Sequence, residues 1–152
     1  MALDETDTQI LEALQKNAQM TAQELGEALN LSASQAGRRR QKLEAEGIIR
    51  TYAARLDPEK LQLHVQAFVQ VEMATHDPEQ VKGFARLVEL QAQIISAWTL
   101  TGEADYLLRV FCSDLSALNR LIHQILLPHP AVARVQSQIV MDQFKPDAGL
   151  PV

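Results

Sequence analysis

The chain has 152 residues, of which 47% are hydrophobic and 22% charged, with six glycines and six prolines. These values exclude a disordered or low-complexity chain, and the length fits one large domain or two small ones. A single cysteine excludes a disulfide framework and a cysteine-based zinc site. Because the acidic N-terminus is no secretory signal and no apolar run reaches the ~20 residues of a membrane span, we expect a cytoplasmic protein with no membrane contact.

The net charge of −5 hides an uneven distribution of charge. No acidic residue occurs between Glu27 and Glu44, and the basic residues of this window are Arg38, Arg39, Arg40 and Lys42. A clustered basic face, rather than a basic total, is the footprint of a DNA-binding protein. The alternative is a solvated basic helix face without a partner.

The beginning of the chain is predicted to be helical. Acids in the first turn precede apolar residues at helical spacing, which predicts a helix over about residues 4–17. Two capping boxes, Thr21–Glu24 and Ser32–Gln35, begin eleven residues apart. This distance leaves room for one short helix and a tight turn, which is the spacing of a helix-turn-helix.

The third helix is expected from Ser32 to Glu46, followed by Gly47 as a helix-ending residue. In a helix-turn-helix this helix enters the major groove, and hydroxyl, amide and basic side chains bond base edges and phosphates. The β-branched stretch 48–53 predicts a short strand, and a hairpin there would be a wing. The candidate DNA-binding residues are Ser32, Ser34, Gln35, Arg38, Arg39, Lys42 and Arg50, of which the last is equally compatible with a simple surface position.

The remainder of the chain alternates strands and helices. Strands are predicted at 64–73, 94–101, 106–112 and 132–142, with helices beginning at the caps Asp77 and Asp114. This order predicts a ferredoxin-like βαββαβ domain with both helices on one face of a four-stranded sheet and the other face free for a second subunit. We therefore predict an α+β protein with a winged helix-turn-helix domain at 1–56, a hinge at 57–63, and a ligand-sensing and oligomerisation domain at 64–152.

No catalytic or metal-binding motif is present, so we expect neither an enzyme nor a cofactor. One predicted turn is nevertheless rich in polar groups, with a glycine, a hydroxyl, two carboxylates and a phenol. Its residues are Thr101, Gly102, Glu103, Asp105 and Tyr106. Backbone groups near Gly102 would hold the carboxylate of a free amino acid, and Asp105 would attract its ammonium group. The alternative is an ordinary solvated turn.

Over nearly its whole length the sequence resembles the Lrp/AsnC (feast/famine) family of bacterial and archaeal transcriptional regulators. The resemblance rests on Leu3–Asp7 with Ile10–Leu11, Leu31–Ser32, Arg39 with Leu43–Ile49, Leu56–Pro58, the turn Thr101–Tyr106, Val140–Asp142 and Leu150–Pro151. It departs from the family at Gly37, at Thr51, where a glycine is frequent, and at Arg40, where the residue is usually apolar. We expect the Arg40 stem to cover the core while its head reaches water, or the helix to be slightly rotated.

The resemblance implies a winged helix-turn-helix joined to a C-terminal regulatory (RAM-type) domain. It also implies double-stranded DNA as a partner, dimers that assemble further, commonly to octamers, and an amino-acid effector bound between subunits near the turn at Gly102. The expected function is a transcriptional regulator that responds to an amino acid. Two alternatives remain open: an architectural, nucleoid-type DNA-binding protein without an effector, and an amino-acid-binding or enzymatic domain whose basic helix is incidental.

Overall fold

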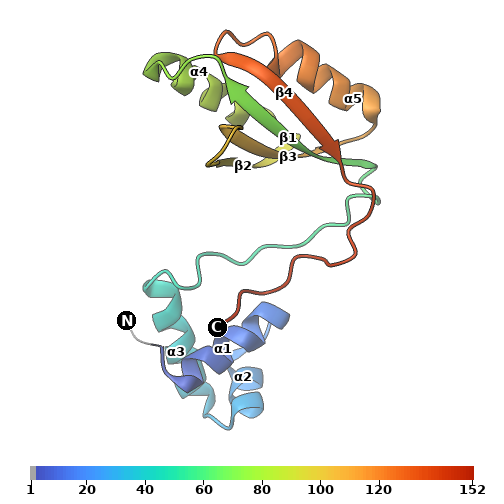
Figure 1. Ribbon diagram of the computed structural model, residues 1–152. Helices are drawn as coiled ribbons and strands as arrows, with labels where there is room; N and C mark the ends of the chain where they lie inside the picture. Colours follow the sequence, from blue (N-terminus) through green and yellow to red (C-terminus); the bar gives the residue numbers. More distant parts are fainter. Residues whose placement is uncertain (1–2) are drawn as a thin grey trace. The chain divides into compact units, whose positions relative to one another are not determined.

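The computed structural model describes residues 3–152, which form two compact units. The first unit is the chain up to Arg55 together with the segment Lys145–Val152, and the second is Leu56–Phe144 (Figure 1). The sequence assigned everything from residue 64 to the C-terminal domain. The last segment instead belongs to the first unit, because side chains of that unit bind its backbone.

The N-terminal unit is built on three helices: α1 (Glu5–Lys16), α2 (Ala22–Leu29) and α3 (Ala33–Ala45). Each begins as predicted, because the side chains of Asp4, Thr21 and Ser32 each accept the backbone N–H three residues further on. Helix α3 ends before Gly47, whose φ of +72° suits a residue without Cβ. The three predicted helices are therefore confirmed.

A small apolar core joins these helices. Its fully or almost fully buried members are Ile10, Leu11, Leu14, Leu25, Ala36 and Leu43. Helix α2 approaches the turn before α3 closely at Gly26, where an added Cβ would lie 2.7 Å from the Leu31 carbonyl oxygen. The tight turn of the helix-turn-helix thus depends on a glycine at this position.

The predicted wing is wrong for this chain. The stretch 48–53 forms no strand, and residues 50–57 have no regular secondary structure. A strand needs a neighbour to complete its backbone hydrogen bonds, and no segment within residues 3–152 pairs with this stretch. Its side chains contact the helices instead: Ile49 packs on the apolar core, and the Tyr52 hydroxyl donates to Glu44.

The C-terminal unit has the predicted βαββαβ order. Its elements are β1 (Val65–Met73), α4 (Pro78–Glu89), β2 (Ile94–Thr99), β3 (Tyr106–Cys112), α5 (Leu115–Arg120), its π-helical continuation η1 (Leu121–Leu126), and β4 (Val132–Ile139). The strands pair antiparallel in the order β2-β3-β1-β4, which is the ferredoxin-like arrangement.

One face of this sheet is covered by its helices (Figure 1). Val69 and Val71 of β1 are fully buried and share a core with Phe84 of α4 and Leu118 of α5. The opposite face is covered by no helix of this unit. Trp98 lies on this open face and is 45% exposed, because it pairs with a β3 residue that points away from the core.

Candidate functional site

The start of α3 is fixed by a reciprocal capping box. The Ser32 hydroxyl accepts the Gln35 N–H at 3.1 Å, and the Gln35 side-chain oxygen accepts the Ser32 N–H at 2.9 Å. Both oxygens are therefore committed to the helix terminus. The Gln35 amide nitrogen and the Ser32 hydroxyl hydrogen are the groups that these two candidate residues have left for DNA.

Helix α3 has a buried side and an exposed polar side. Ala36 and Leu43 are fully buried in the core of the unit. Ser34, Arg38 and Lys42 are exposed and four residues apart, so they lie along one face of the helix. This row places a hydroxyl and two cations on a single solvent-facing strip, which is the arrangement that a recognition helix presents to a groove.

Arg39 is turned toward the protein. Its NH1 nitrogen lies 2.7 Å from Asp4 Oδ2 and 2.6 Å from Asp7 Oδ1, and Asp7 is almost completely buried. The hydrogen bond from the Asp7 N–H and the bond from Arg39 lower the pKa of Asp4, while the two carboxylates raise the pKa of Arg39. Arg39 thus ties α3 to the start of α1.

Arg40 is also bound within the unit, whereas the sequence led us to expect that its head reaches water or that the helix is slightly rotated. Its NH1 donates to the Met20 carbonyl at 2.8 Å and its Nε to Glu44 Oε1 at 3.0 Å. The guanidinium lies 4.8 Å from the centre of the Tyr52 ring. Hydrogen bonds from Tyr52, and then from Arg40, lower the pKa of Glu44.

The remaining basic candidate, Arg50, and a further basic residue, Arg55, follow α3. Arg50 is exposed in the segment without secondary structure, so it has no wing to hold it toward DNA. Arg55 donates to the backbone oxygen of Asp147 at 2.6 Å. The basic side of the N-terminal unit is therefore concentrated on α3, at Arg38 and Lys42.

In the second unit, the turn between β2 and β3 does not gather its polar side chains around one point. Gly102 has a φ of +111°, which requires glycine. The Asp105 carboxylate accepts the Met73 N–H at 2.7 Å, and Tyr106 packs against Phe84 with 5.4 Å between ring centroids. Asp105 therefore fixes the turn to β1, and Tyr106 belongs to the helix-covered side of the sheet. Of the predicted ligand residues, Glu103 lines a hollow next to the turn, on the open face of the sheet.

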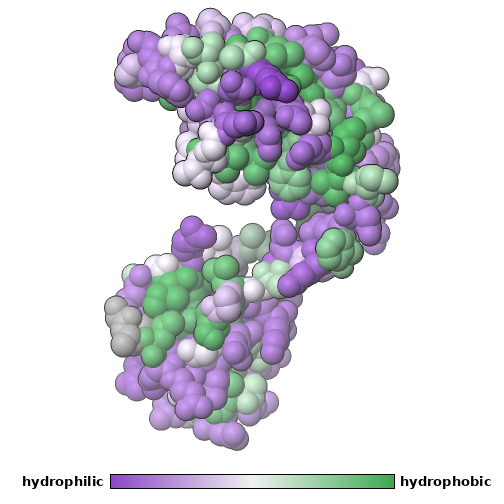
Figure 2. Space-filling model, in the orientation of Figure 1, coloured by the Kyte–Doolittle hydropathy of each residue, from purple (hydrophilic) through white to green (hydrophobic). Residues whose placement is uncertain are grey.

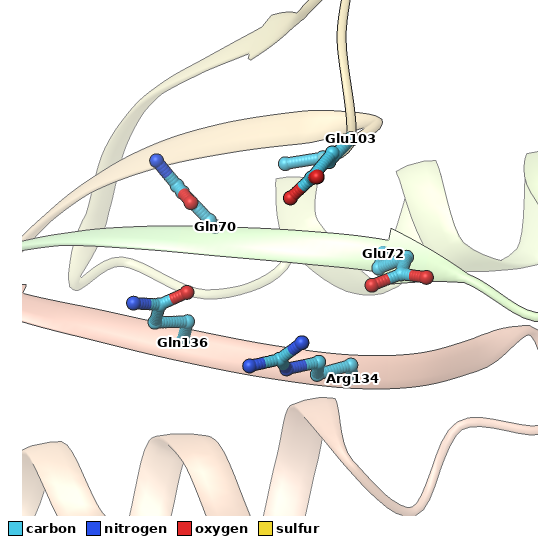
Figure 3. Close-up of a pocket in the computed structure, with 6 residues that line it drawn as sticks. Gln70, Glu72, Glu103, Arg134 and Gln136 are labelled. Atoms are coloured by element: carbon cyan, nitrogen blue, oxygen red, sulfur yellow. The ribbon is translucent and has the colours of Figure 1, made fainter.

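This hollow lies on the open face of the sheet and is shallow, with a cavity volume of about 40 Å³, well below the ~300 Å³ of the smallest typical ligand pockets (Figure 3). It is lined by Gln70, Glu72, Glu103, Ala104, Arg134 and Gln136. Glu72 pairs directly with Arg134 across β1 and β4, and Gln70 pairs with Gln136, so the four side chains stand on one face. Opposite charges and two amides thus line an open polar site.

The β4 residues of this hollow were missed by the sequence analysis. Alternation places Gln70 and Glu72 on the polar side of β1, and that signal was visible. Arg134 and Gln136 are more than sixty residues further along the chain, and their placement depends on the β1–β4 register. A residue pattern alone carries no information about that register.

Within residues 3–152, no three His, Cys, Asp or Glu side chains are grouped so that they would hold a metal ion. Each helix in the same part of the chain is too short or too polar to span a bilayer. The space-filling view shows hydrophobic surface (green) among hydrophilic side chains on each unit (Figure 2).

Both parts of the chain match known protein families. Residues 3–44 match the AsnC-type helix-turn-helix domain, and residues 66–150 match the Lrp/AsnC ligand binding domain. Together these matches cover nearly all of the helices of the first unit and of the sheet of the second.

Similar proteins cover almost the full chain. This chain is 32% identical over 150 residues to the DNA-binding transcriptional activator DecR of Escherichia coli K12, and the match covers 99% of each chain. It is 33% identical to the glutamate uptake regulatory protein of Zymomonas mobilis (99% of this chain, 91% of that protein). A crystal structure of a transcriptional regulator from Neisseria meningitidis in complex with L-Met is 39% identical, covers 99% of this chain and 97% of that one, and superimposes with a TM-score of 0.94.

Proposed function

The chain belongs to the Lrp/AsnC family of DNA-binding transcriptional regulators, and from this premise we propose that it binds promoter DNA through α3 and that a free amino acid at its C-terminal unit changes this binding. The observation that carries the DNA-binding part is the exposed row of Ser34, Arg38 and Lys42 on a capped helix. A protein with this function works on chromosomal DNA, so we place it in the cytoplasm of a bacterial or archaeal cell.

The proposed contacts on α3 differ in kind. Arg38, in the first half of the helix, has the fork geometry that bonds a phosphate as well as guanine O6 and N7. Lys42 is a point charge suited to a phosphate, and Ser34 and the Gln35 amide nitrogen supply neutral hydrogen bonds near the helix start. Arg39 acts through the fold, since both carboxylates that it binds belong to the N-terminal part of the same unit.

The proposed effector is a zwitterion, because the hollow offers both signs of charge. Arg134 would receive its carboxylate, and Glu72 or Glu103 its ammonium group, while Gln70 and Gln136 would bond polar atoms (Figure 3). The turn at Gly102 supplies Glu103 and shapes the rim. The complex of the Neisseria meningitidis regulator with L-Met supports an amino acid as the ligand class.

The hollow is open on one side, and we propose that a second copy of the chain closes it. The same sheet face exposes Trp98, and Phe68 lies on it as well, so apolar surface surrounds the polar site. Burying these side chains against a partner contributes roughly 25 cal/mol for each Å² of apolar surface removed from water. A two-fold dimer follows from this arrangement, and the family resemblance implies further assembly, commonly to octamers.

The test is binding of the full-length chain to DNA from upstream of its own gene, measured by fluorescence anisotropy with each of the twenty amino acids added in turn. We expect salt-dependent binding that at least one amino acid shifts several-fold. Arg134→Gln should abolish that shift and retain DNA binding. Arg86→Gln on α4 removes the same charge from the helix-covered side and should leave the shift unchanged.

The outcomes separate the alternatives. Binding that no amino acid alters would indicate an architectural DNA-binding protein. Absence of DNA binding with retained amino-acid binding would contradict the proposed function and favour an amino-acid-binding or enzymatic domain.

A further inference from the structure

Arg40 connects three segments of the N-terminal unit. It lies in the middle of α3, donates to the Met20 carbonyl in the turn before α2, and stacks on Tyr52 after the end of α3. About a quarter of its side chain is exposed. Its position in the basic window suggests a DNA contact, but its Nε and NH1 groups donate within the unit.

Glu44 completes this cluster. A single oxygen, Oε1, accepts both Arg40 Nε at 3.0 Å and the Tyr52 hydroxyl at 2.7 Å. The ring and hydroxyl of Tyr52 are therefore held from two directions by side chains one helical turn apart on α3. Charge-assisted hydrogen bonds of this kind are about twice as strong as neutral ones.

Tyr52 belongs to a segment whose backbone is not held by a strand. Residues 50–57 form neither helix nor strand, so side-chain contacts decide the path of the chain there. At Tyr52 these contacts are the stacking on Arg40 and the bond to Glu44. The direction in which the chain leaves the helix-turn-helix is thus coupled to α3 through Arg40 and Glu44, which Arg40 also binds.

We propose that Arg40 is a positioning residue for DNA recognition: with Glu44 and Tyr52 it sets the direction in which the chain leaves the helix-turn-helix, and so the distance between the half-sites that two joined copies bind. It makes no contact with DNA. The inference rests on the proposed function, because it requires two copies of the chain on one DNA. Half-site separation is fixed by the geometry that joins two recognition helices, and one helical turn of DNA corresponds to ~34 Å.

The experiment uses the full chain and DNA duplexes that carry two copies of the half-site selected by the unmodified protein. The spacer between the half-sites is varied one base pair at a time, and each affinity is measured at several salt concentrations. Arg40→Met retains an apolar stem and loses the guanidinium. Tyr52→Phe retains the ring and loses the hydroxyl bond to Glu44, so it tests the cluster if Arg40→Met fails to fold. Arg38→Ala is the matched control for loss of a contacting arginine.

We expect the unmodified chain to prefer one spacing, and Arg40→Met and Tyr52→Phe to reduce that preference at least threefold without changing the slope of affinity against salt. Arg38→Ala should retain the spacing preference and lower the slope by about 0.9, as expected for one lost phosphate contact. A lesion that merely destabilised the domain would weaken binding equally at every spacing.

Two results would overturn the inference. A salt slope lowered in Arg40→Met as in Arg38→Ala would make Arg40 a DNA contact, and an unchanged spacing preference in Tyr52→Phe would show that the cluster does not direct the chain. If the unmodified chain selected no half-site, the proposed function would fail first, and this inference with it.

Discussion

The side-chain amide of Gln15 binds both backbone groups of Leu150, 135 residues further along the chain. Gln15 Nε2 donates to the Leu150 carbonyl at 3.0 Å, and its Oε1 accepts the Leu150 N–H at 2.5 Å. Gly149 lies so close that an added Cβ would be 2.7 Å from Gln15 Oε1. The C-terminal segment is therefore held against α1 by a side-chain amide that binds both backbone groups of one residue.

Loss of the Gln15 amide should release this segment. In Gln15→Ala we expect the Leu150 amide hydrogen to exchange roughly five- to tenfold faster, since one hydrogen bond contributes about 1 kcal/mol. Gly149→Ala should have the same effect, because its methyl group displaces the amide. Hydrogen exchange followed by NMR measures the exchange rate in both variants. The control is Gln19→Ala, which removes an exposed amide shortly after α1. Unchanged exchange in both variants would mean that the segment is held by other contacts.

Of the basic residues of α3, Arg38 and Lys42 are exposed, whereas Arg39 is bound to two carboxylates. This division predicts that their removal changes the salt dependence of DNA binding by different amounts. Arg38→Ala and Lys42→Ala should each lower the slope of log affinity against log salt by about 0.9. Arg39→Ala should lower it by less than half of that, because Asp4 and Asp7 already bind its guanidinium. Titrations at four or more salt concentrations measure the slopes. Equal slopes for all three variants would contradict this division between exposed and internally bound basic residues.

Two glycines of the helix-turn-helix should respond oppositely to alanine. Gly26→Ala should lower the free energy of unfolding by about 1–3 kcal/mol, because its Cβ would press on the backbone of the turn before α3. Gly37→Ala should raise it by up to ~1 kcal/mol, because its Cβ would only touch Ala22 at 3.4 Å and helix propensity improves. Urea denaturation followed by circular dichroism checks both signs, and stabilisation by Gly26→Ala would contradict the tight turn.

The stability of the N-terminal unit should fall in acid. The pKa values of Asp4 and Glu44 are lowered below their ordinary 3.8 and 4.5, so the unfolded chain binds protons before the folded one does. Their contribution to stability is present above those ordinary values and is lost as pH falls through the lowered ones. Asp4→Asn and Glu44→Gln should each reduce the dependence of the unfolding free energy on pH below 4.5. The check is denaturation at a series of pH values, and a slope as steep as in the unmodified chain would contradict the assignment.

Features that depend on neighbouring residues were predictable from the sequence. The caps at Thr21 and Ser32 and the alternation along β1 are local patterns, and each placed its helix or strand within one or two residues. The wing failed because alternation predicts an extended chain and says nothing about whether a partner strand exists. The stretch 48–53 has the composition of a strand and no partner within the described chain.

The candidate site was predictable only in part, for a related reason. The basic window located α3, but which of its arginines remain exposed depends on Asp4, Asp7 and Met20, which are 20 to 35 residues away. The polar turn likewise drew attention to Glu103, whereas Arg134 enters the same hollow through a strand at the far end of the domain. Spacing along the chain identifies candidate residue types, and tertiary contacts decide what each of them binds.

Asp105 is the clearest case in which a tertiary contact, rather than the sequence pattern, shows what a residue binds. The sequence predicts that its carboxylate attracts the ammonium group of an amino acid, whereas in the structure it accepts the Met73 N–H at 2.7 Å while the Asp105 backbone N–H donates to the Val71 carbonyl. We expect Asp105→Ala to lower the unfolding free energy by about 1–3 kcal/mol, because the Met73 N–H loses its partner. Asp105→Asn retains an oxygen acceptor there and should remain close to the unmodified protein.

Calorimetry with the amino acid identified in the binding screen distinguishes the two roles. If Asp105 fixes the turn, Asp105→Asn should bind the amino acid within about twofold of the unmodified chain, since the charge takes no part in the contact. If it receives the ammonium group, the same substitution should cost roughly 2–4 kcal/mol, the penalty for removing one partner of a buried charge pair. Glu72→Gln is the matched comparison, because Glu72 lies in the hollow beside Arg134. Strong loss in Asp105→Asn with none in Glu72→Gln would move the ammonium site from the sheet face to the turn.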